Sequence, residues 1–181
     1  DTDPTNSVFS IGTTGAVNEA NKDYIAYCWS EVNGFSKFNT YTGSGGSGNK
    51  VTTGFKPRFV MVKRTTNISG SHMGWVMIDS ERGYNKRLSA QSSVEENDGP
   101  INAASSPNDD ITFQDDGFTL ESSGSATNGS GETYIYAAFG DRAGNNWTPN
   151  NLIANAGLGT ARQGMDVVTW TGNGAEQKIG G

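Results

Sequence analysis

Short apolar stretches separated by Gly, Asn and Ser recur along the 181 residues of this chain. Alternation of apolar and polar positions between turn residues is typical of β-strands, and few stretches have the spacing of an amphipathic helix. The pattern predicts nine strands, at 8–11, 24–31, 37–42, 58–63, 75–79, 111–114, 117–121, 133–139 and 166–171. Many short strands at close spacing favour an all-β fold, an antiparallel β-sandwich of the jelly-roll or lectin-like kind.

Two polar stretches interrupt this rhythm. Residues 81–110 predict a long polar surface loop with room for one helical turn. Residues 43–48 are rich in Gly and Ser, but a phosphate-binding loop would have to open a helix and carry a Lys in register, and here a strand follows. We therefore expect a flexible hairpin loop at 43–48.

Composition agrees with a thin, aromatic core. The chain has 25 Gly, is 33% hydrophobic and 18% charged, and 10% of its residues are aromatic. Few but large apolar side chains are enough to fill a thin core between two packed sheets.

Charge and rare residues exclude several functions. The net charge of -6, with scattered Lys and Arg, argues against a nucleic-acid partner. Cys28, the single cysteine, lies in an apolar run and is predicted to be a core residue, with a reactive thiol as the alternative. His72 is the single histidine, which excludes sites that need two imidazoles. No apolar run has the length of a membrane span, so no membrane partner is expected.

Two segments recur within the chain. Residues 37–45 are similar to residues 166–174, with an offset of 129 between Tyr41 and Trp170. Residues 24–29 are similar to 134–139, with an offset of 110 between Tyr24 and Tyr134. Internal similarity of this kind predicts a repeat architecture, and the alternative is chance likeness between Gly-rich hairpins.

The repeat predicts three parts of the chain. These are a β-sandwich repeat unit at 1–142, a linker or insertion at 143–164 and the start of a second repeat at 165–181. The start of a repeat cannot bury its own apolar face. We therefore expect the natural polypeptide to continue, or a neighbouring subunit to complete the sheet.

One known family resembles this pattern. The run YIAYCWSEVNGFSKF at 24–38 is followed by Tyr-Thr-Gly at 41–43, Thr-Gly-Phe-Lys-Pro at 53–57 and Val-Met-Val-Lys-Arg at 60–64. Together these segments resemble a repeat of structural proteins from marine tailed phages, especially cyanophages. The resemblance spans about residues 9–142 as one unit. It implies a lectin-like or laminin-G-like sandwich in a tail fibre or other virion-surface protein, without catalytic residues.

Paired carboxylates are the first candidate for site chemistry. Asp109 and Asp110 precede the predicted strand at 111–114, and Asp115 and Asp116 follow it. Such pairs can bind calcium through oxygen ligands, but the spacing of a calcium loop is missing, and Asp is common at turns. We expect no cofactor and no metal, with calcium at these four residues as the alternative.

Aromatic and basic residues in polar stretches are candidates for ligand or subunit contact. Trp147 lies in a polar link, where it suits a sugar ring or a groove on a neighbouring subunit. Tyr84 and Arg82 belong to the only local basic and aromatic cluster. The tryptophans within predicted strands are expected to pack in the core: Trp29, Trp75 and Trp170.

These features predict a protein that is not an enzyme. No nucleophile motif surrounds His72, and no pair of acids stands out as a glycosidase site. The first functional hypothesis is a structural component of a phage virion, located at the particle surface. Its expected partners are other virion subunits, in a homo-oligomer assembled through repeated β domains. The alternative is a carbohydrate-binding module that attaches to a host-surface glycan.

Overall fold

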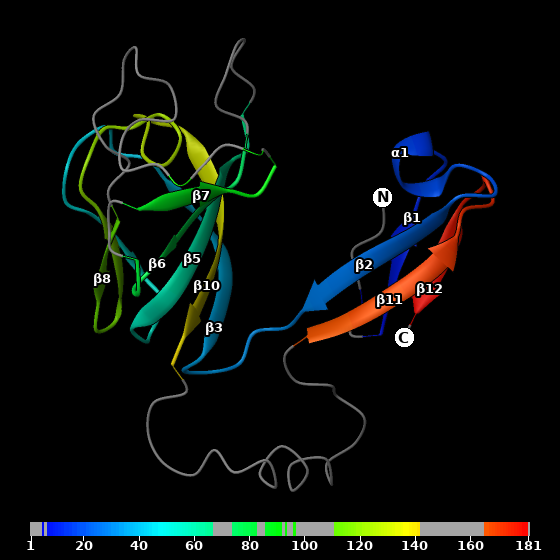
Figure 1. Ribbon diagram of the computed structural model, residues 1–181, viewed down its shortest axis with the longest axis horizontal. Coiled ribbons are helices and arrows are strands. Elements are labelled where there is room, and N and C mark those ends of the chain that lie inside the picture. Colours follow the sequence, from blue (N-terminus) through cyan, green and yellow to red (C-terminus); the bar gives the residue numbers. More distant parts are fainter. Residues whose placement is uncertain are drawn as a thin grey trace, which may run out of the picture. The chain divides into compact units, whose positions relative to one another are not determined.

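The computed structural model describes residue 5 and residues 7–66, 74–82, 86–91, 93, 96, 111–141 and 165–180. In this part of the chain there are twelve β-strands and one short helix, α1 (Gly15–Asn18), so the all-β prediction is confirmed (Figure 1). The contacts divide the chain into two compact units: unit 1 comprises residues 1–30 and 146–181, and unit 2 comprises 31–145. No helix in the described ranges is long and apolar enough to cross a membrane.

Unit 2 contains two antiparallel sheets. One has the strand order β3-β10-β5-β6-β7, and the other has the order β4-β9-β8. Their bounds are β3 (Ser36–Thr42), β4 (Asn49–Thr52), β5 (Pro57–Arg64), β6 (Val76–Asp79), β7 (Arg87–Ser89), β8 (Ile111–Gln114), β9 (Gly117–Leu120) and β10 (Thr133–Gly140). Side chains from both sheets form one buried cluster, as expected of a sandwich.

The core of unit 2 follows the alternation of its strands. Val60 and Val62 on β5 are fully buried, and so are Phe118 and Leu120 on β9. Tyr134 on β10 is fully buried as well, within the same cluster. Side chains two positions apart point to the same face of a sheet, so these alternating apolar positions define the interior.

Unit 1 is built from the two ends of the described chain. β1 (Val8–Ile11) pairs with β12 (Gln177–Gly180), and β2 (Asp23–Trp29) pairs with β11 (Met165–Thr171), both antiparallel. Trp170 packs between Phe9, at 5.9 Å between ring centroids, and Tyr24, at 5.4 Å.

The structure differs from the sequence-based expectation in its short strands. Three of them were not predicted, namely β4, β7 and β12, and β7 lies within the stretch expected to be a polar loop. Local sequence does not show them, since each is defined by pairing with a strand that is distant or polar in sequence. The division into repeat parts at 142 and 165 stays a prediction.

Candidate functional site

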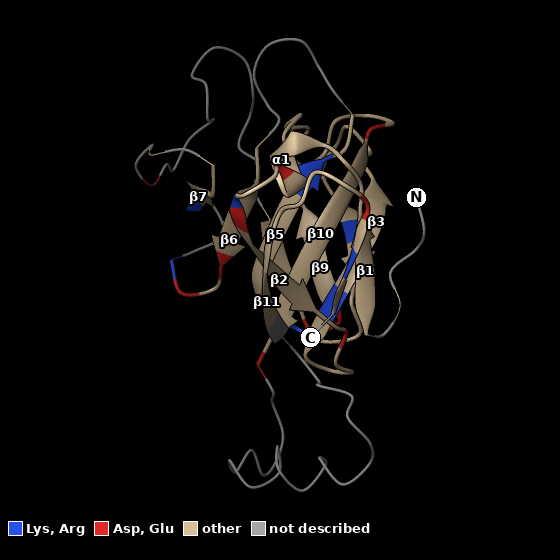
Figure 2. Ribbon diagram, turned by 90° about the vertical axis from the view of Figure 1, so that its right-hand side faces the viewer, with Lys and Arg blue, Asp and Glu red and all other residues tan. Residues whose placement is uncertain are grey.

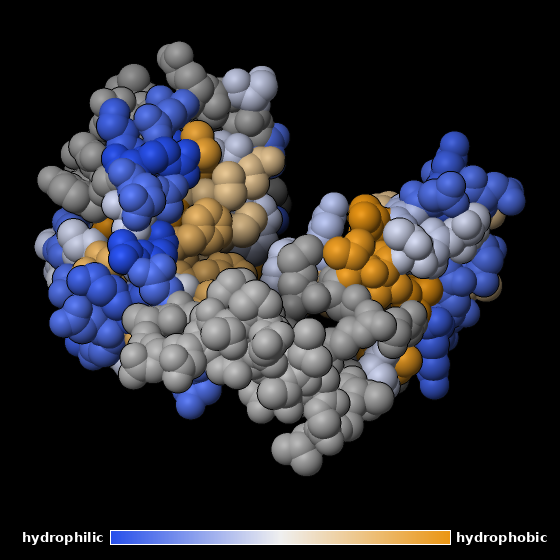
Figure 3. All heavy atoms as spheres, turned by 60° about the horizontal axis from the view of Figure 1, so that its bottom comes forward, coloured by the Kyte–Doolittle hydropathy of each residue, from blue (hydrophilic) through white to orange (hydrophobic). Residues whose placement is uncertain are grey.

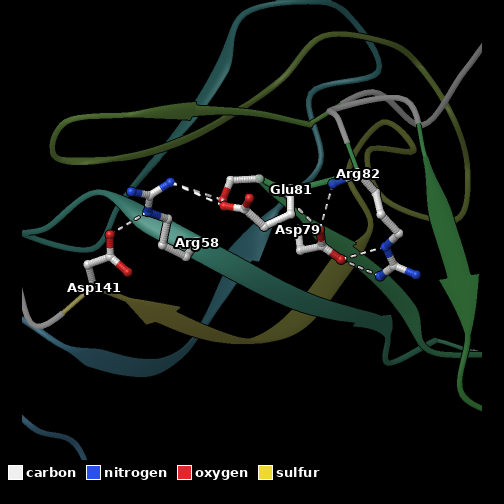
Figure 4. Close-up of polar contacts among 6 residues, drawn as sticks. Arg58, Asp79, Glu81, Arg82 and Asp141 are labelled. Carbon is white, nitrogen blue, oxygen red and sulfur yellow. Dashed lines mark hydrogen bonds and ion pairs between the residues drawn. The ribbon is translucent and has the colours of Figure 1, made fainter.

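Arg82, one of the predicted contact residues, takes part in a local ion pair after β6. Its Nε donates to Asp79 Oδ2 at 2.6 Å, and its backbone N–H donates to Asp79 Oδ1 at 2.9 Å (Figure 4). Burial alone would raise the pKa of Asp79, but the hydrogen bonds and charge of Arg82 outweigh burial and hold this pKa below its usual value. Arg82 also approaches Glu96 at 3.7 Å. Its guanidinium group therefore stabilises a turn in this structure.

Arg58 joins three segments beside this turn. Its Nε donates to Asp141 Oδ2 at 2.6 Å, and its Nη1 lies 3.5 Å from Glu81 Oε1 (Figure 4). The contacts connect the start of β5, the turn after β6 and the residue that follows β10. Sequence reasoning missed them, because no local motif relates residues so far apart. The side chains are about half exposed or more, so each pair contributes only about 0–1 kcal/mol.

The acidic pair Asp115 and Asp116 forms the turn between β8 and β9. Lys56 Nζ lies 3.2 Å from Asp115, and Lys50 Nζ lies 2.8 Å from Asp116. The hydrogen bond from Lys50 holds the pKa of Asp116 below its usual value. Among the described residues, no group of three or more His, Cys, Asp or Glu side chains is placed to hold a metal ion. Both carboxylates thus lie in a turn, and each is paired with a lysine.

The remaining predicted site residues lie outside the described ranges: Tyr84, Asp109, Asp110 and Trp147. Where the structure does describe charged residues, both signs are scattered over the elements in the view of Figure 2.

An exposed apolar surface on unit 1 is the candidate interaction site. Ile25, Tyr27 and Trp29 on β2 are 52%, 53% and 50% exposed, and Val167 on β11, opposite Tyr27, is 47% exposed. We call these four residues the β2 face. Apolar side chains, drawn in orange, gather on the part of unit 1 seen in Figure 3. Monomeric proteins rarely expose contiguous large apolar side chains without a partner for them.

The β2 face corrects one prediction. Trp29 was expected to pack in the core, but it lies on the outward face of β2 and contacts Tyr27, with 6.3 Å between the ring centroids. Strand alternation explains this, because Tyr24 and Cys28 take the inward positions and are half-buried. Apolar residues thus line both sides of the strand, and hydropathy alone could not tell which side is covered.

Unit 1 repeats a strand pair of unit 2. Tyr24 on β2 pairs with Trp170 on β11, and Tyr134 on β10 pairs with Tyr41 on β3. Both ring pairs are stacked, at 5.4 Å and 16° in unit 1 and at 5.1 Å and 12° in unit 2. The two similar segments found in the sequence therefore occupy equivalent places in two different pairs of strands.

A buried asparagine accompanies the pair in unit 2. Asn128 is 0% exposed, and its Nδ2 donates to the backbone oxygens of Ser122 at 2.7 Å and Gly46 at 2.8 Å. Its Oδ1 accepts hydrogen bonds from Ser44 N and Asn49 Nδ2, both at 2.8 Å. The loop at 43–48 was expected to be a flexible hairpin, but Asn128 ties it to the segment before β10.

Asn18 makes the same set of contacts in unit 1, and it is also 0% exposed. Its Nδ2 donates to the backbone oxygens of Gly12 at 2.8 Å and Ala175 at 2.5 Å. Its Oδ1 accepts from Asn173 N at 3.1 Å and Gln177 Nε2 at 2.9 Å. Both asparagines follow Ala by two positions and precede the stacked tyrosine by six, a signal that the sequence analysis did not use.

The tyrosine hydroxyls repeat as well. Tyr134 Oη donates to Ser125 O and accepts from Gly129 N, both at 2.7 Å. Tyr24 Oη donates to Gly15 O at 2.8 Å and accepts from Glu19 N at 2.9 Å. The two units therefore share strand register, ring stacking, a buried amide and a tyrosine-bonded turn.

Comparison with known proteins now adds a family. Residues 1–143 match the family described as Domain of unknown function (DUF7483). The chain belongs to the DUF7483 family. The match includes β1, β2 and the strands of unit 2, whereas β11 and β12 lie beyond it. No curated protein and no solved structure matches the chain.

Proposed function

We propose that this DUF7483 protein is a non-enzymatic structural component of a phage virion, a fibre or capsid-surface protein that assembles through repeated β domains. One observation carries the assembly part of the proposal: the same strand pair, with the same buried asparagine and tyrosine contacts, is built twice in one chain. Repeated blocks that bury their apolar faces against neighbours are typical of proteins that extend by stacking. The resemblance of residues 24–64 to repeats of phage structural proteins supports the proposal that the protein is part of a virion.

The β2 face is the proposed contact surface. Its exposed residues are aromatic or aliphatic, and the centres of protein interfaces are enriched in aromatic side chains. A further copy of this chain is the proposed partner, because homo-oligomers are the commonest assemblies and the chain already repeats its own building block.

Sedimentation velocity over a range of concentrations tests this proposal. The wild-type chain should associate as its concentration rises, whereas the double variant Tyr27→Ser, Trp29→Ser should remain monomeric. Thr169→Ser is the matched control, because Thr169 is exposed on β11 and pairs with Ile25, so its substitution changes the same surface by one methyl group. A wild-type chain that stays monomeric throughout, or a double variant that associates as strongly, would refute assembly through this face.

Carbohydrate binding is the competing outcome. The exposed rings of Tyr27 and Trp29 also offer a surface on which a sugar ring can stack. A glycan array probed with the same variants separates the two functions. If the monomeric wild-type chain binds a glycan and the double variant does not, the proposed function would change from assembly to attachment to a host glycan.

A further inference from the structure

Three Asn-Gly pairs lie in the loops and turns between strands, at residues 33–34, 128–129 and 173–174. An asparagine followed by glycine can lose its side-chain amide without an enzyme, because glycine has no side chain to keep its backbone nitrogen away from the asparagine. The reaction closes a ring, so its rate depends on how freely the two groups reach one another. The three pairs share their local sequence and differ in their folded surroundings.

The pair Asn128-Gly129 is held at both reacting groups. Asn128 is 0% exposed, and its amide is fixed by hydrogen bonds to residues 44–49 and to Ser122. Gly129 N, the atom that would attack, donates to Tyr134 Oη at 2.7 Å. A Cβ on Gly129 would lie 3.1 Å from the same hydroxyl, so there is little space beside this nitrogen. Ring closure at this pair therefore requires local opening of unit 2.

The pair Asn173-Gly174 is exposed but still restrained. Asn173 Oδ1 accepts a hydrogen bond from Ala175 N at 2.8 Å, which fixes the side chain against its own turn. Gly174 N donates to the backbone oxygen of Asn18 at 3.1 Å. Both hydrogen bonds must break before the nitrogen can reach the side-chain carbon.

The pair Asn33-Gly34 has neither restraint. Both residues are exposed, and no described residue forms a hydrogen bond with the side-chain amide of Asn33 or with Gly34 N. Nothing lies within 4 Å of a Cβ position on Gly34. The turn is fixed at its base, where Val32 O accepts from Phe35 N and Ser36 N, both at 2.9 Å. An anchored turn thus presents both reacting groups to water.

Backbone conformation does not separate the two exposed pairs. Gly34 and Gly174 both have a φ of 72°. Asn33-Gly34 and Asn173-Gly174 are therefore a matched comparison, in which the hydrogen bonds of the reacting groups are the main difference.

We infer that Asn33 is a site of spontaneous deamidation, which reacts ahead of Asn173 and Asn128 in the folded chain. Gly34 N loses its proton and bonds to Asn33 Cγ, while the bond from Cγ to the side-chain nitrogen breaks and ammonia leaves. Water then opens the resulting succinimide ring. Addition of water at Cγ gives aspartate, and addition at the backbone carbonyl carbon gives isoaspartate, in which the main chain continues through Cγ. Water is the only co-reactant, and nothing is oxidised or reduced.

Deamidation changes both the charge and the length of this turn. A carboxylate replaces a neutral amide, which adds one negative charge to the net charge of -6. Isoaspartate also adds one carbon to the main chain of a turn that closes through Val32 O. The modified turn should therefore open more readily at the start of unit 2. This inference is independent of the proposed function and holds for an assembled or a monomeric chain.

Ageing of the full chain tests the order of reaction. The chain is incubated in mildly alkaline buffer, with and without guanidinium chloride, and is then digested with trypsin at slightly acidic pH. The three pairs fall in different tryptic peptides, 23–37, 88–142 and 163–178, so mass spectrometry measures the conversion of amide to acid at each asparagine.

In the folded chain, Asn33 should convert about tenfold faster than Asn173, because two hydrogen bonds restrain the latter. It should convert at least about a hundredfold faster than Asn128, whose reaction waits for local opening. In guanidinium chloride the three rates should converge, because the local sequence is the same. Equal rates in the folded chain, or a leading rate at Asn128 or Asn173, would overturn the inference.

Two variants assign the early product to one residue. Asn33→Gln should abolish the first acidic form resolved by ion-exchange chromatography, because ring closure from the longer glutamine side chain is much slower. Asn39→Gln is the matched control: Asn39 is exposed on β3 and precedes Thr40, whose side chain hinders attack, so this variant should keep the acidic form. Hydroxylamine cleaves a succinimide and should cut the wild-type chain between residues 33 and 34. An acidic form that persists in Asn33→Gln, or disappears in Asn39→Gln, would overturn the assignment to Asn33.

Discussion

Asn128 uses every hydrogen-bonding position of its side-chain amide while fully buried, and Asn18 does the same in unit 1. A side-chain amide has two donors and an oxygen that accepts twice, so both residues satisfy their full capacity. Asn128 joins its own loop to residues 44–49, and Asn18 joins its own loop to residues 173–177. Such a buried amide is therefore expected to contribute more to the stability of the folded unit than an exposed amide does.

Substitution of Asn128 by Ala should destabilise unit 2 by about 3 kcal/mol or more, because several buried donors and acceptors lose their partners at once. The free energy of unfolding in urea, followed by far-UV circular dichroism, measures this. Asn39→Ala is the control: Asn39 is exposed on β3, and its removal should change stability by less than about 0.5 kcal/mol. Similar losses in the two variants would contradict the role assigned to the buried amide.

Removal of one hydroxyl distinguishes the two copies of the tyrosine contact. Tyr134→Phe should cost about 1–2 kcal/mol, because the buried hydroxyl donates to Ser125 O and accepts from Gly129 N. Tyr24→Phe should cost less, because Tyr24 is only half-buried and water can reach the groups that lose their partner. Urea denaturation of both variants compares them. A larger loss of unfolding free energy for Tyr24→Phe than for Tyr134→Phe would contradict the argument from burial.

Sequence reasoning identified some of these residues and missed others. The internal similarity found Tyr24 and Tyr134, because strands keep their aromatic positions when they are repeated. It missed Asn18 and Asn128, whose partners are backbone and side-chain atoms of loops that only folding brings together. Trp29 was placed in the core because hydropathy does not tell which face of a strand is covered.

At the scale of elements, each of the nine predicted strands overlaps a strand of the structure, with ends that differ by up to two residues. The three missed strands are three or four residues long, and β4, β7 and β12 contain Asn, Lys, Arg or Gln in place of an apolar alternation. Backbone pairing with β9, β6 and β1 keeps these strands extended. The strand pairs β3–β10 and β2–β11 join segments far apart in the chain, and a hydrophobic pattern within one segment carries no information about its partner.

A glycine beside each strand pair makes close packing possible. A Cβ on Gly43 would lie 2.1 Å from the backbone oxygen of Gly129, and a Cβ on Gly172 would lie 2.1 Å from that of Glu19. Gly43→Ala and Gly172→Ala should each destabilise their own unit by about 2 kcal/mol or more, because the backbone must move apart. Gly46→Ala is the control, since nothing lies within 4 Å of its Cβ position. Hydrogen exchange read by mass spectrometry assigns each loss to a unit, and a loss confined to Gly46→Ala would contradict the packing argument.

At the scale of the whole molecule, strands that are distant in sequence pair with one another in both units. Unit 2 is continuous in sequence, but unit 1 combines residues 1–30 with residues 146–181. The sequence pointed to equivalent segments at both ends, yet their pairing with one another follows from backbone hydrogen bonds that no local pattern encodes. Separate units can respond separately to a change of conditions.

Carboxylates with lowered pKa values occur within unit 2: Glu31, Asp79, Asp116 and Glu132. For Glu132, the hydrogen bond from Thr66 is the largest cause, and Arg64 adds a second hydrogen bond and its charge. For Glu31, the main cause is the hydrogen bond from Lys37. Each of these carboxylates is stabilised in its charged form by a contact that forms only in the folded state.

The folded form of unit 2 should therefore lose stability in acid. A carboxylate whose pKa is lower in the folded state contributes its full stabilisation above the unfolded pKa, near 4.5 for Glu, and loses it as the pH falls through the folded pKa. Hydrogen-exchange protection of β5 and β10 should stay constant from pH 7 to about pH 5, after correction for intrinsic exchange, and then fall. Glu132→Gln should lower protection at pH 7 and make its pH dependence shallower, because the ion pair with Arg64 no longer titrates. Protection that rises as the pH falls below 5 would mean that repulsion between carboxylates, rather than pairing with cations, dominates the electrostatics of this unit.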